Sequence, residues 1–168
     1  MTFGNVPMYD RILVPTDGSA ETKRVVAHAA ELAEAHEAEL HAIYVINSAT
    51  FASLPMETSW EGVTDMLQDE GESALDDVRE VANRYDVSLT THLVDGAPNK
   101  EIVRYAEREG FDLIVMGTHG RGGIDRLLLG SVAERVVRAS TVPVLTVRVE
   151  KDDVSPKAEA TEKAKGSS

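Results

Sequence analysis

Cysteine is absent from the 168 residues, and no apolar run is longer than the five residues 42–46. Without thiols the chain has no disulfide scaffold, iron–sulfur cluster, zinc ribbon or cysteine nucleophile. The five His, at 28, 36, 41, 92 and 119, show no spacing typical of metal ligands. A membrane-spanning helix needs roughly 18 apolar residues, and residues 1–10 lack the basic start and apolar core of a signal peptide. We therefore expect a cytoplasmic protein without a membrane partner.

Lysine is also scarce in residues 1–150, which contain only Lys23 and Lys100 but eleven Arg, and the whole chain has a net charge of −12. An acidic, lysine-poor surface is typical of proteins adapted to high salt, where charge repulsion is strongly screened. An ordinary acidic protein is the alternative. In either case the negative charge argues against nucleic acid as a partner, because its phosphates would be repelled.

Residues 151–168 differ in composition from the rest of the chain. They have no aromatic residue, only Val154 as a branched aliphatic side chain, and four Lys balanced by four acids. Such a segment buries too little apolar surface to offset the entropy lost on ordering. We expect a folded domain over residues 1–150 and a disordered tail over residues 151–168.

Strand-length apolar stretches alternate with helical periodicities along the folded part. The expected strands are residues 11–15, 40–46, 87–94, 113–116 and 144–149. The expected helices are residues 19–36 and 64–85, a third from a cap at Asn99 to Gly110, and a fourth over 131–139. This alternation with short connections predicts an α/β fold with a single open parallel sheet and helices on both faces.

The apolar patterns of the strands also predict their order. Residues 12–14, 42–46 and 113–116 are continuously apolar, which is typical of strands buried on both faces, whereas the third and fifth strands alternate as edge strands do. Right-handed crossovers then give the five-stranded order 3-2-1-4-5. This order reverses between the first and fourth strands, so we expect a ligand at their carboxyl ends.

The first strand ends in Pro15, Thr16 and Asp17, followed by Gly18. The carboxylate of Asp17 has the chemistry to accept hydrogen bonds from a ribose or to hold Mg²⁺. A turn or helix-cap carboxylate beside Gly18 is the alternative interpretation.

Five of the twelve glycines fall within fourteen residues after the fourth strand, at positions 117, 120, 122, 123 and 130. Such a cluster lets backbone N–H groups approach an oxyanion, and phosphate is the natural ligand. Ser131 and Glu134 have the spacing of a capping box. Ser131 is therefore expected either to cap its own helix or to hold a phosphate at the helix N-terminus, with Arg121 and Arg126 as cationic donors.

Two well-known phosphate motifs do not fit this loop, because it contains no Lys for a P-loop and Asp125 stands where a dinucleotide motif needs Gly. The pattern present is Gly117-x2-Gly120-x9-Gly130-Ser131. It resembles the signature of the ATP-binding members of the universal stress protein family, and residues 9–149 resemble that family in motif order. The resemblance implies an adenine nucleotide alpha hydrolase-like fold of order 3-2-1-4-5.

The resemblance also implies a binding site for ATP and Mg²⁺. Asp17 matches the partner of the ribose or metal, and Val45 the residue whose backbone pairs with adenine. The remaining implied positions are Pro15 and Thr16 beside adenine, Met116 and Gly117 at the pocket floor, Gly120, Arg121 and Gly122 over the phosphates, and Gly130, Ser131 and Val132 in the triphosphate cradle.

The sequence leaves function open between three classes. The first is an ATP-binding regulatory protein that forms a homodimer, as family members typically do, through the edge strand Val144 to Val149. The second is a slow ATPase or nucleotidyl-transfer enzyme, with His119 as a base; a local hydrogen bond is the other interpretation of His119. The third is an interaction protein with an empty pocket.

Overall fold

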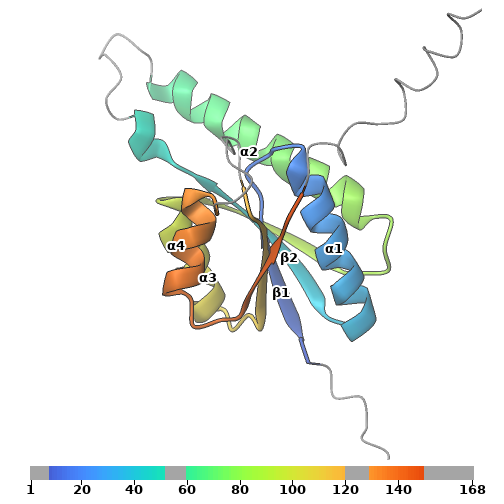
Figure 1. The fold of residues 1–168 in the computed structure, drawn as a ribbon. Helices are drawn as coiled ribbons and strands as arrows, with labels where there is room; N and C mark the ends of the chain where they lie inside the picture. The colour runs from blue at the N-terminus through green and yellow to red at the C-terminus, as the bar shows by residue number, and fades with distance from the viewer. Residues whose placement is uncertain (1–7, 52–59, 120–128, 150–168) are drawn as a thin grey trace, which may run out of the picture.

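A computed structural model of the chain describes residues 8–51, 60–119 and 129–149 (Figure 1). The predicted phosphate-loop residues Gly120, Arg121 and Gly122 lie outside the described residues. The same is true of Arg126 and of the tail 151–168.

Five parallel strands form one open sheet. They are β1 (Arg11–Pro15), β2 (Glu39–Ile46), β3 (Leu89–Asp95), β4 (Leu113–Gly117) and β5 (Val144–Val147). Their order is β3-β2-β1-β4-β5, and every neighbouring pair is parallel. The strand order predicted from apolar continuity is therefore confirmed.

Helices cover both faces of this sheet, as predicted (Figure 1). One face carries α1 (Glu21–His36) and α2 (Trp60–Ala82), and the other carries α3 (Pro98–Arg108) and α4 (Ser131–Ala139). A 3-10 turn, η1 (Ser48–Phe51), follows β2. Among the described residues no helix combines the length and the apolar composition required to cross a bilayer.

Alternation along β1 shows how the two cores are separated. Ile12 and Val14 pack under α1 and α2, whereas Leu13, between them, packs under α3 and α4. All three are fully buried, because successive side chains of a strand point to opposite faces. We call these layers the α1/α2 face and the α3/α4 face.

The helix cap predicted at Asn99 is wrong. Asn99 lies inside α3, whose N-cap is Ala97 and whose first residue is Pro98. Proline suits that position because its missing N–H would have no intrahelical acceptor. The predicted helix 131–139 is confirmed as α4. Of the two roles considered for Ser131, the cap does not apply, because Gly130 is the N-cap and makes no side-chain cap bond.

The predicted ends of several elements shift for local reasons. Regular helix begins at Glu21 instead of 19, because turn hydrogen bonds occupy the residues after β1. The ladder between β2 and β3 begins at the pair Leu40 and Leu89, so residues 87–88 precede the strand. The strand β5 ends at Val147, which is paired with Gly117, the last residue of β4. The helix α2 spans Trp60–Ala82 instead of 64–85.

Candidate functional site

A cavity of about 320 Å³ opens at the carboxyl ends of β1, β2 and β4. Its volume lies at the lower end of the range usual for small-molecule sites. The cavity lies where the strand order reverses between β1 and β4, which is the place predicted from the sequence. In α/β sheets this is the position where loops diverge and ligands bind.

Seven of the predicted site residues line this cavity. They come from the end of β1, the end of β2, the end of β4 and the first turn of α4: Pro15, Thr16, Asp17, Val45, Met116, Gly117 and Val132. Topology therefore brings together side chains that are more than 100 positions apart in the sequence. Gly130 and Ser131 are not among the described lining residues, and their role stays a prediction.

Asp17 occupies a turn that prepares the start of α1. Its Oδ1 accepts hydrogen bonds from the Ser19 N–H at 2.9 Å and the Thr22 hydroxyl at 3.0 Å. The Gly18 N–H meanwhile donates to the Thr16 hydroxyl at 3.1 Å, and Gly18 has a positive φ of 78°. The turn role is thus observed, and the same residue also faces the cavity. The two interpretations of Asp17 are compatible.

Gly117 lets β4 end directly in the cavity wall. A Cβ at this position would lie 3.3 Å from the His119 carbonyl oxygen and 3.4 Å from Val25 Cγ2. The first distance is tighter than most real Cβ contacts, so a side chain here would push on the backbone that follows β4. The glycine predicted at the pocket floor therefore has a steric reason to be there.

The N-terminus of α4 lies next to the same strand. The Gly130 N–H donates to the Thr118 carbonyl at 2.6 Å, and the Thr118 N–H donates to the Val147 carbonyl at 3.1 Å. These bonds tie α4 to the ends of β4 and β5. The first N–H groups of a helix have no intrahelical acceptor, and Val132, the second residue of α4, contacts the cavity.

His119 has one nitrogen engaged and one without a partner. Its Nδ1 lies 3.0 Å from the Thr118 hydroxyl. Its Nε2 is buried, and it is the buried side-chain polar atom of the described residues that has no hydrogen-bond partner. Unsatisfied buried polar atoms are rare and call for a partner. A residue of the cavity wall with such an atom fits a site that receives a polar ligand group.

The cavity is lined by carboxylates, not by cations. Asp17, Glu21 and Glu70 contribute to the lining, and no Lys or Arg does so among the described residues. No cluster of three His, Asp or Glu in the described parts of the chain has the arrangement of a metal site. Mg²⁺ often binds through one or two carboxylates together with substrate phosphates. Asp17 fits that mode, in which the metal arrives with a nucleotide.

The deeper wall of the cavity is apolar. Side chains from both core layers reach it, among them Val25, Ile43, Val45, Ile102 and Met116. Such a wall suits a flat or aliphatic part of a ligand, while the polar rim suits its hydroxyl and phosphate groups. The cavity therefore has an apolar part and a polar part, which suits an amphipathic small molecule.

Sequence reasoning missed the contributions of α2 and α3 to the cavity. Leu67 and Glu70 reach it from α2, and Pro98 and Ile102 from α3. Leu67 and Ile102 belong to apolar helix faces, which the periodicity assigns to the core. No local signal shows that a core face also reaches a cavity, because that depends on where each helix ends above the sheet.

An open parallel sheet with a cavity at the reversal of strand order defines a small-molecule-binding α/β domain. Residues 8–148 match the sequence profile of the universal stress protein family. The universal stress protein MJ0531 of Methanocaldococcus jannaschii is 43% identical over 146 residues, covering 87% of this chain and 86% of the relative. The chain therefore belongs to the universal stress protein family.

Solved structures agree with this assignment. The structure of protein MJ0577, also from Methanocaldococcus jannaschii, has a TM-score of 0.75 at 30% identity and covers 86% of this chain and 99% of that chain. A universal stress protein solved in complex with cAMP has a TM-score of 0.62 at 28% identity, covering 83% of this chain and 96% of that one.

Proposed function

We propose that this chain is a cytoplasmic, ATP-binding regulatory protein that holds its nucleotide in the cavity between the ends of β1 and β4. The observation that carries the proposal is the meeting of Asp17, Gly117 and Val132 around one cavity at the strand-order reversal. The structural relative in complex with cAMP supports an adenine nucleotide as the ligand. Gly120, Arg121, Gly122, Gly130 and Ser131 complete the proposed site from sequence.

Magnesium is part of this proposal because of the charges around the cavity. The carboxylates of Asp17, Glu21 and Glu70 would repel a free triphosphate. A metal bound to the phosphates and to Asp17 turns this repulsion into attraction. We therefore expect Mg²⁺ to strengthen nucleotide binding, with Arg121 as an additional cation.

Binding, rather than catalysis, is the activity that the described residues support. Phosphoryl transfer needs cations on the leaving group and a positioned base. Among the described lining residues His119 is the one imidazole, and no guanidinium or ammonium group accompanies it. A nucleotide held without turnover suits a regulatory role in the stress response.

A thermal-shift titration with ATP and Mg²⁺ tests the proposal. A ligand that binds only the folded state stabilises it by about 2.7 kcal/mol at 100 times its dissociation constant. The Asp17→Asn variant should lose most of the shift, because the amide keeps Oδ1 as an acceptor for the turn but removes the charge. Glu31→Gln, on the exposed surface of α1, is the matched control and should keep the shift.

The same experiment separates the alternatives. A melting temperature that does not respond to ATP with Mg²⁺ would contradict the proposal and favour an interaction protein with an empty pocket. Release of phosphate above the spontaneous rate, abolished in His119→Ala, would instead favour an ATPase. ATP remaining intact after prolonged incubation supports the binding role.

We further propose that the chain acts as a homodimer through the edge strand β5 and the residues that follow it to Val149. In the described residues β5 pairs only with β4, so its outer edge offers unpaired backbone groups, and its four residues are only partly buried. An exposed edge of this kind favours pairing with a second strand.

Sedimentation equilibrium tests the dimer and should give twice the monomer mass. Thr146→Pro, which removes a backbone donor, should shift the measured mass towards that of the monomer. A monomeric wild-type protein at high concentration would contradict this.

A further inference from the structure

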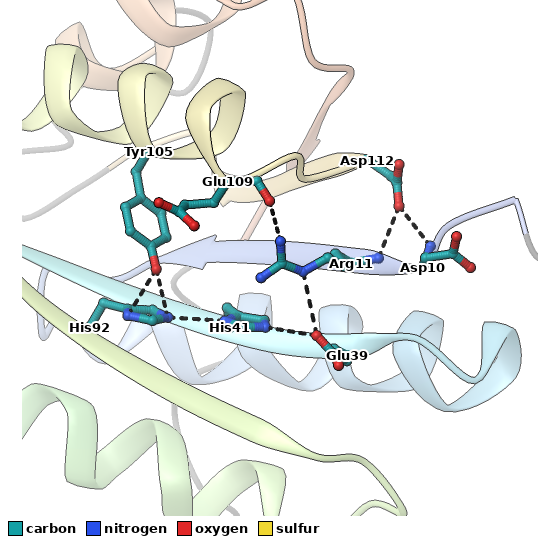
Figure 2. A network of polar contacts seen from close by, with 8 residues as sticks. All are labelled: Asp10, Arg11, Glu39, His41, His92, Tyr105, Glu109 and Asp112. Carbon is teal, nitrogen blue, oxygen red and sulfur yellow. Dashed lines mark hydrogen bonds and ion pairs between the residues drawn. The ribbon is translucent and has the colours of Figure 1, made fainter.

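A chain of polar side chains crosses the α3/α4 face away from the cavity (Figure 2). His41 Nε2 lies 3.3 Å from Glu39 Oε2, and His41 Nδ1 lies 3.0 Å from His92 Nε2. The hydroxyl of Tyr105 lies 2.9 Å from His92 Nδ1 and 3.0 Å from its Nε2. We call Glu39, His41, His92 and Tyr105 the histidine network. It connects β2 and β3 to helix α3.

The network runs from exposed Glu39 to buried His41 and on to half-buried His92 and Tyr105. His41 is 7% exposed and His92 is half-buried. The ring of buried Phe111 meets His41 edge-on at 4.9 Å between centroids and lies 5.6 Å from that of Tyr105. The two imidazoles are nearly coplanar, with 2° between their planes, which is the geometry of an in-plane nitrogen-to-nitrogen hydrogen bond. Packing against Phe111 therefore limits the access of water to His41.

Counting protons shows that the network is satisfied when both imidazoles are neutral. His41 Nε2–H then donates to Glu39, and His92 Nε2–H donates to His41 Nδ1. Tyr105 donates its hydroxyl proton to His92 Nδ1, which is the nitrogen left free to accept. Each of these three hydrogen bonds has one donor and one acceptor, and the 3.0 Å contact of the Tyr105 oxygen with His92 Nε2 is an alternative to the one with Nδ1.

One added proton is also accommodated. With His41 charged beside the Glu39 carboxylate, its Nδ1–H donates to His92 Nε2. His92 then carries its proton on Nδ1 and donates it to the Tyr105 oxygen. The bond from His41 Nε2–H to Glu39 keeps its direction, and the bonds between His41 and His92 and between His92 and Tyr105 are kept with their directions reversed.

A second proton breaks the network. Both nitrogens of the 3.0 Å contact between His41 and His92 would then carry hydrogen, so neither could accept. Two positive rings, one of them buried, would also lie in contact. Relief requires the His92 ring to move away from His41, and Tyr105 of α3 contacts that same ring.

Burial and the surrounding charges act on the pKa values of His92 and Glu39. Burial lowers the pKa of His92, the positive charge of His41 lowers it further, and Arg11 adds to the effect against the opposing influence of Glu109. The hydrogen bond from His41 lowers the pKa of Glu39, which Arg11 also faces at 3.4 Å. From α3, Arg108 lies over the Tyr105 ring. The groups around His92 therefore oppose a second positive charge.

Helix α3 links this network to the cavity. Pro98 and Ile102, in its first turns, line the cavity, and Tyr105 lies about one turn further along the same helix. Ile43, two residues after His41 on β2, also lines the cavity. A displacement of α3 at Tyr105 would therefore reach the cavity wall.

We propose that the histidine network is an acid-sensitive latch, which fastens α3 to the sheet when it carries at most one added proton and releases it when both imidazoles are charged. Acidification then loosens the α3 wall of the cavity and weakens ligand binding. The statement on ligand binding rests on the proposed function, whereas the release of α3 does not.

The first test measures urea unfolding of the full chain between pH 8 and pH 5. Because His92 binds a proton more readily in the unfolded state, the unfolding equilibrium constant should rise as the pH falls below about 6.5. The rise should approach tenfold per pH unit for this one proton.

His92→Gln keeps an amide donor and acceptor without titrating and should remove that part of the pH dependence. His28→Gln, at an exposed position on α1, is the matched control and should keep it. Equal slopes in the wild type and His92→Gln would overturn the proposal.

The second test needs no variant. Nitrogen chemical shifts of the imidazoles report tautomer and charge, and amide hydrogen exchange, corrected for intrinsic rates, reports the opening of α3. We expect one proton to be taken up without a change in α3 protection, and the second together with at least a tenfold loss of protection in α3 but not in α1. Two charged imidazoles with α3 still protected would overturn the latch.

The third test uses adenosine, which has no phosphate that titrates in this range. Its dissociation constant should rise on acidification in the wild type and stay constant in His92→Gln. Adenosine affinity that is independent of pH, in a protein whose α3 opens, would overturn the coupling to the cavity. Absence of adenosine binding at every pH would count against the proposed ligand and leave the first two tests to decide on the latch.

Discussion

The two faces of the sheet are held in different ways. The α1/α2 face is a continuous apolar layer in which Ala29, Ala30 and Ala33 are fully buried and bring α1 close to the strands. The α3/α4 face has a smaller apolar cluster, to which Ile43 and Ile114 belong, beside the histidine network. The packing of the α1/α2 face therefore depends on shape and buried apolar area. The packing of the α3/α4 face depends in addition on the protonation state of the histidine network.

This difference predicts that the two faces contribute differently to the pH dependence of the free energy of unfolding. The apolar contacts of the α1/α2 face contain no titratable group, so their contribution to the free energy of unfolding is independent of pH near neutrality. The α3/α4 face contains His92, whose lowered pKa makes its contribution fall as the pH decreases. Three substitutions test this contrast.

The largest effect is expected on the α1/α2 face. Leu40 is fully buried there, and Leu40→Ala should reduce the free energy of unfolding by about 2–5 kcal/mol through lost burial and a residual cavity. Urea unfolding at pH 8 and pH 5.5 should give the same loss. A loss that differs by more than about 1 kcal/mol between the two pH values would contradict the independence of the two faces.

A smaller effect is expected at the histidine network. Tyr105→Phe removes one hydroxyl hydrogen bond and should lower the free energy of unfolding by about 0.5–1.5 kcal/mol at pH 8. The loss should disappear at a pH where the network is already broken. Tyr85→Phe, on a ring that packs against the α1/α2 face, is the control and should have a pH-independent effect. A Tyr105→Phe loss that is constant with pH would argue against the latch.

The smallest effect is expected at Glu107, at the far end of α3. Hydrogen bonds from the Thr141 N–H, at 3.1 Å, and hydroxyl, at 2.8 Å, lower the pKa of this carboxyl. The resulting stabilisation is present above the unfolded pKa of about 4.5 and is lost as the pH falls below it. Glu107→Gln should therefore reduce the pH dependence of the free energy of unfolding only below pH 4.5, as measured by urea unfolding at a series of pH values. A change near pH 6 would mean that the acidic and the histidine transitions are coupled.

The α1/α2 face was the easier one to predict from the sequence. Val25 and Ala29 recur at helical spacing, Leu75, Val78 and Ala82 do so in the next helix, and all of them are buried. Strand order followed from apolar continuity in β1, β2 and β4. These signals are local, and the pattern of burial that they predict is simple.

The histidine network could not be predicted in the same way. Alternation in β3 predicted an edge strand, which is confirmed, but it did not predict that His92 packs against Tyr105 of α3. The register that sets His41 beside His92 depends on the pairing of β2 with β3, which two lone histidines in the sequence do not reveal. An aromatic residue on the helix after a strand that contains His is the one signal present.

The candidate site was predicted in part, for a similar reason. Glycines and a carboxylate at strand ends mark the cavity, and topology then places Asp17 and Gly117 together. The cap predicted at Asn99 was wrong because α3 already begins at Pro98, which suits the first helical position. Ser131 begins α4 as predicted, with Gly130 as the N-cap.

The central strand also has a consequence for synthesis on the ribosome. The strand β1 is made first, and it pairs with β2 soon afterwards, but its other neighbour, β4, follows about a hundred residues later. The partners that β1 and β2 need on one side, β2 and β3, are therefore synthesised well before β4. Both β1 and β4 contribute to the cavity, so its wall is complete only after β4 has left the ribosome.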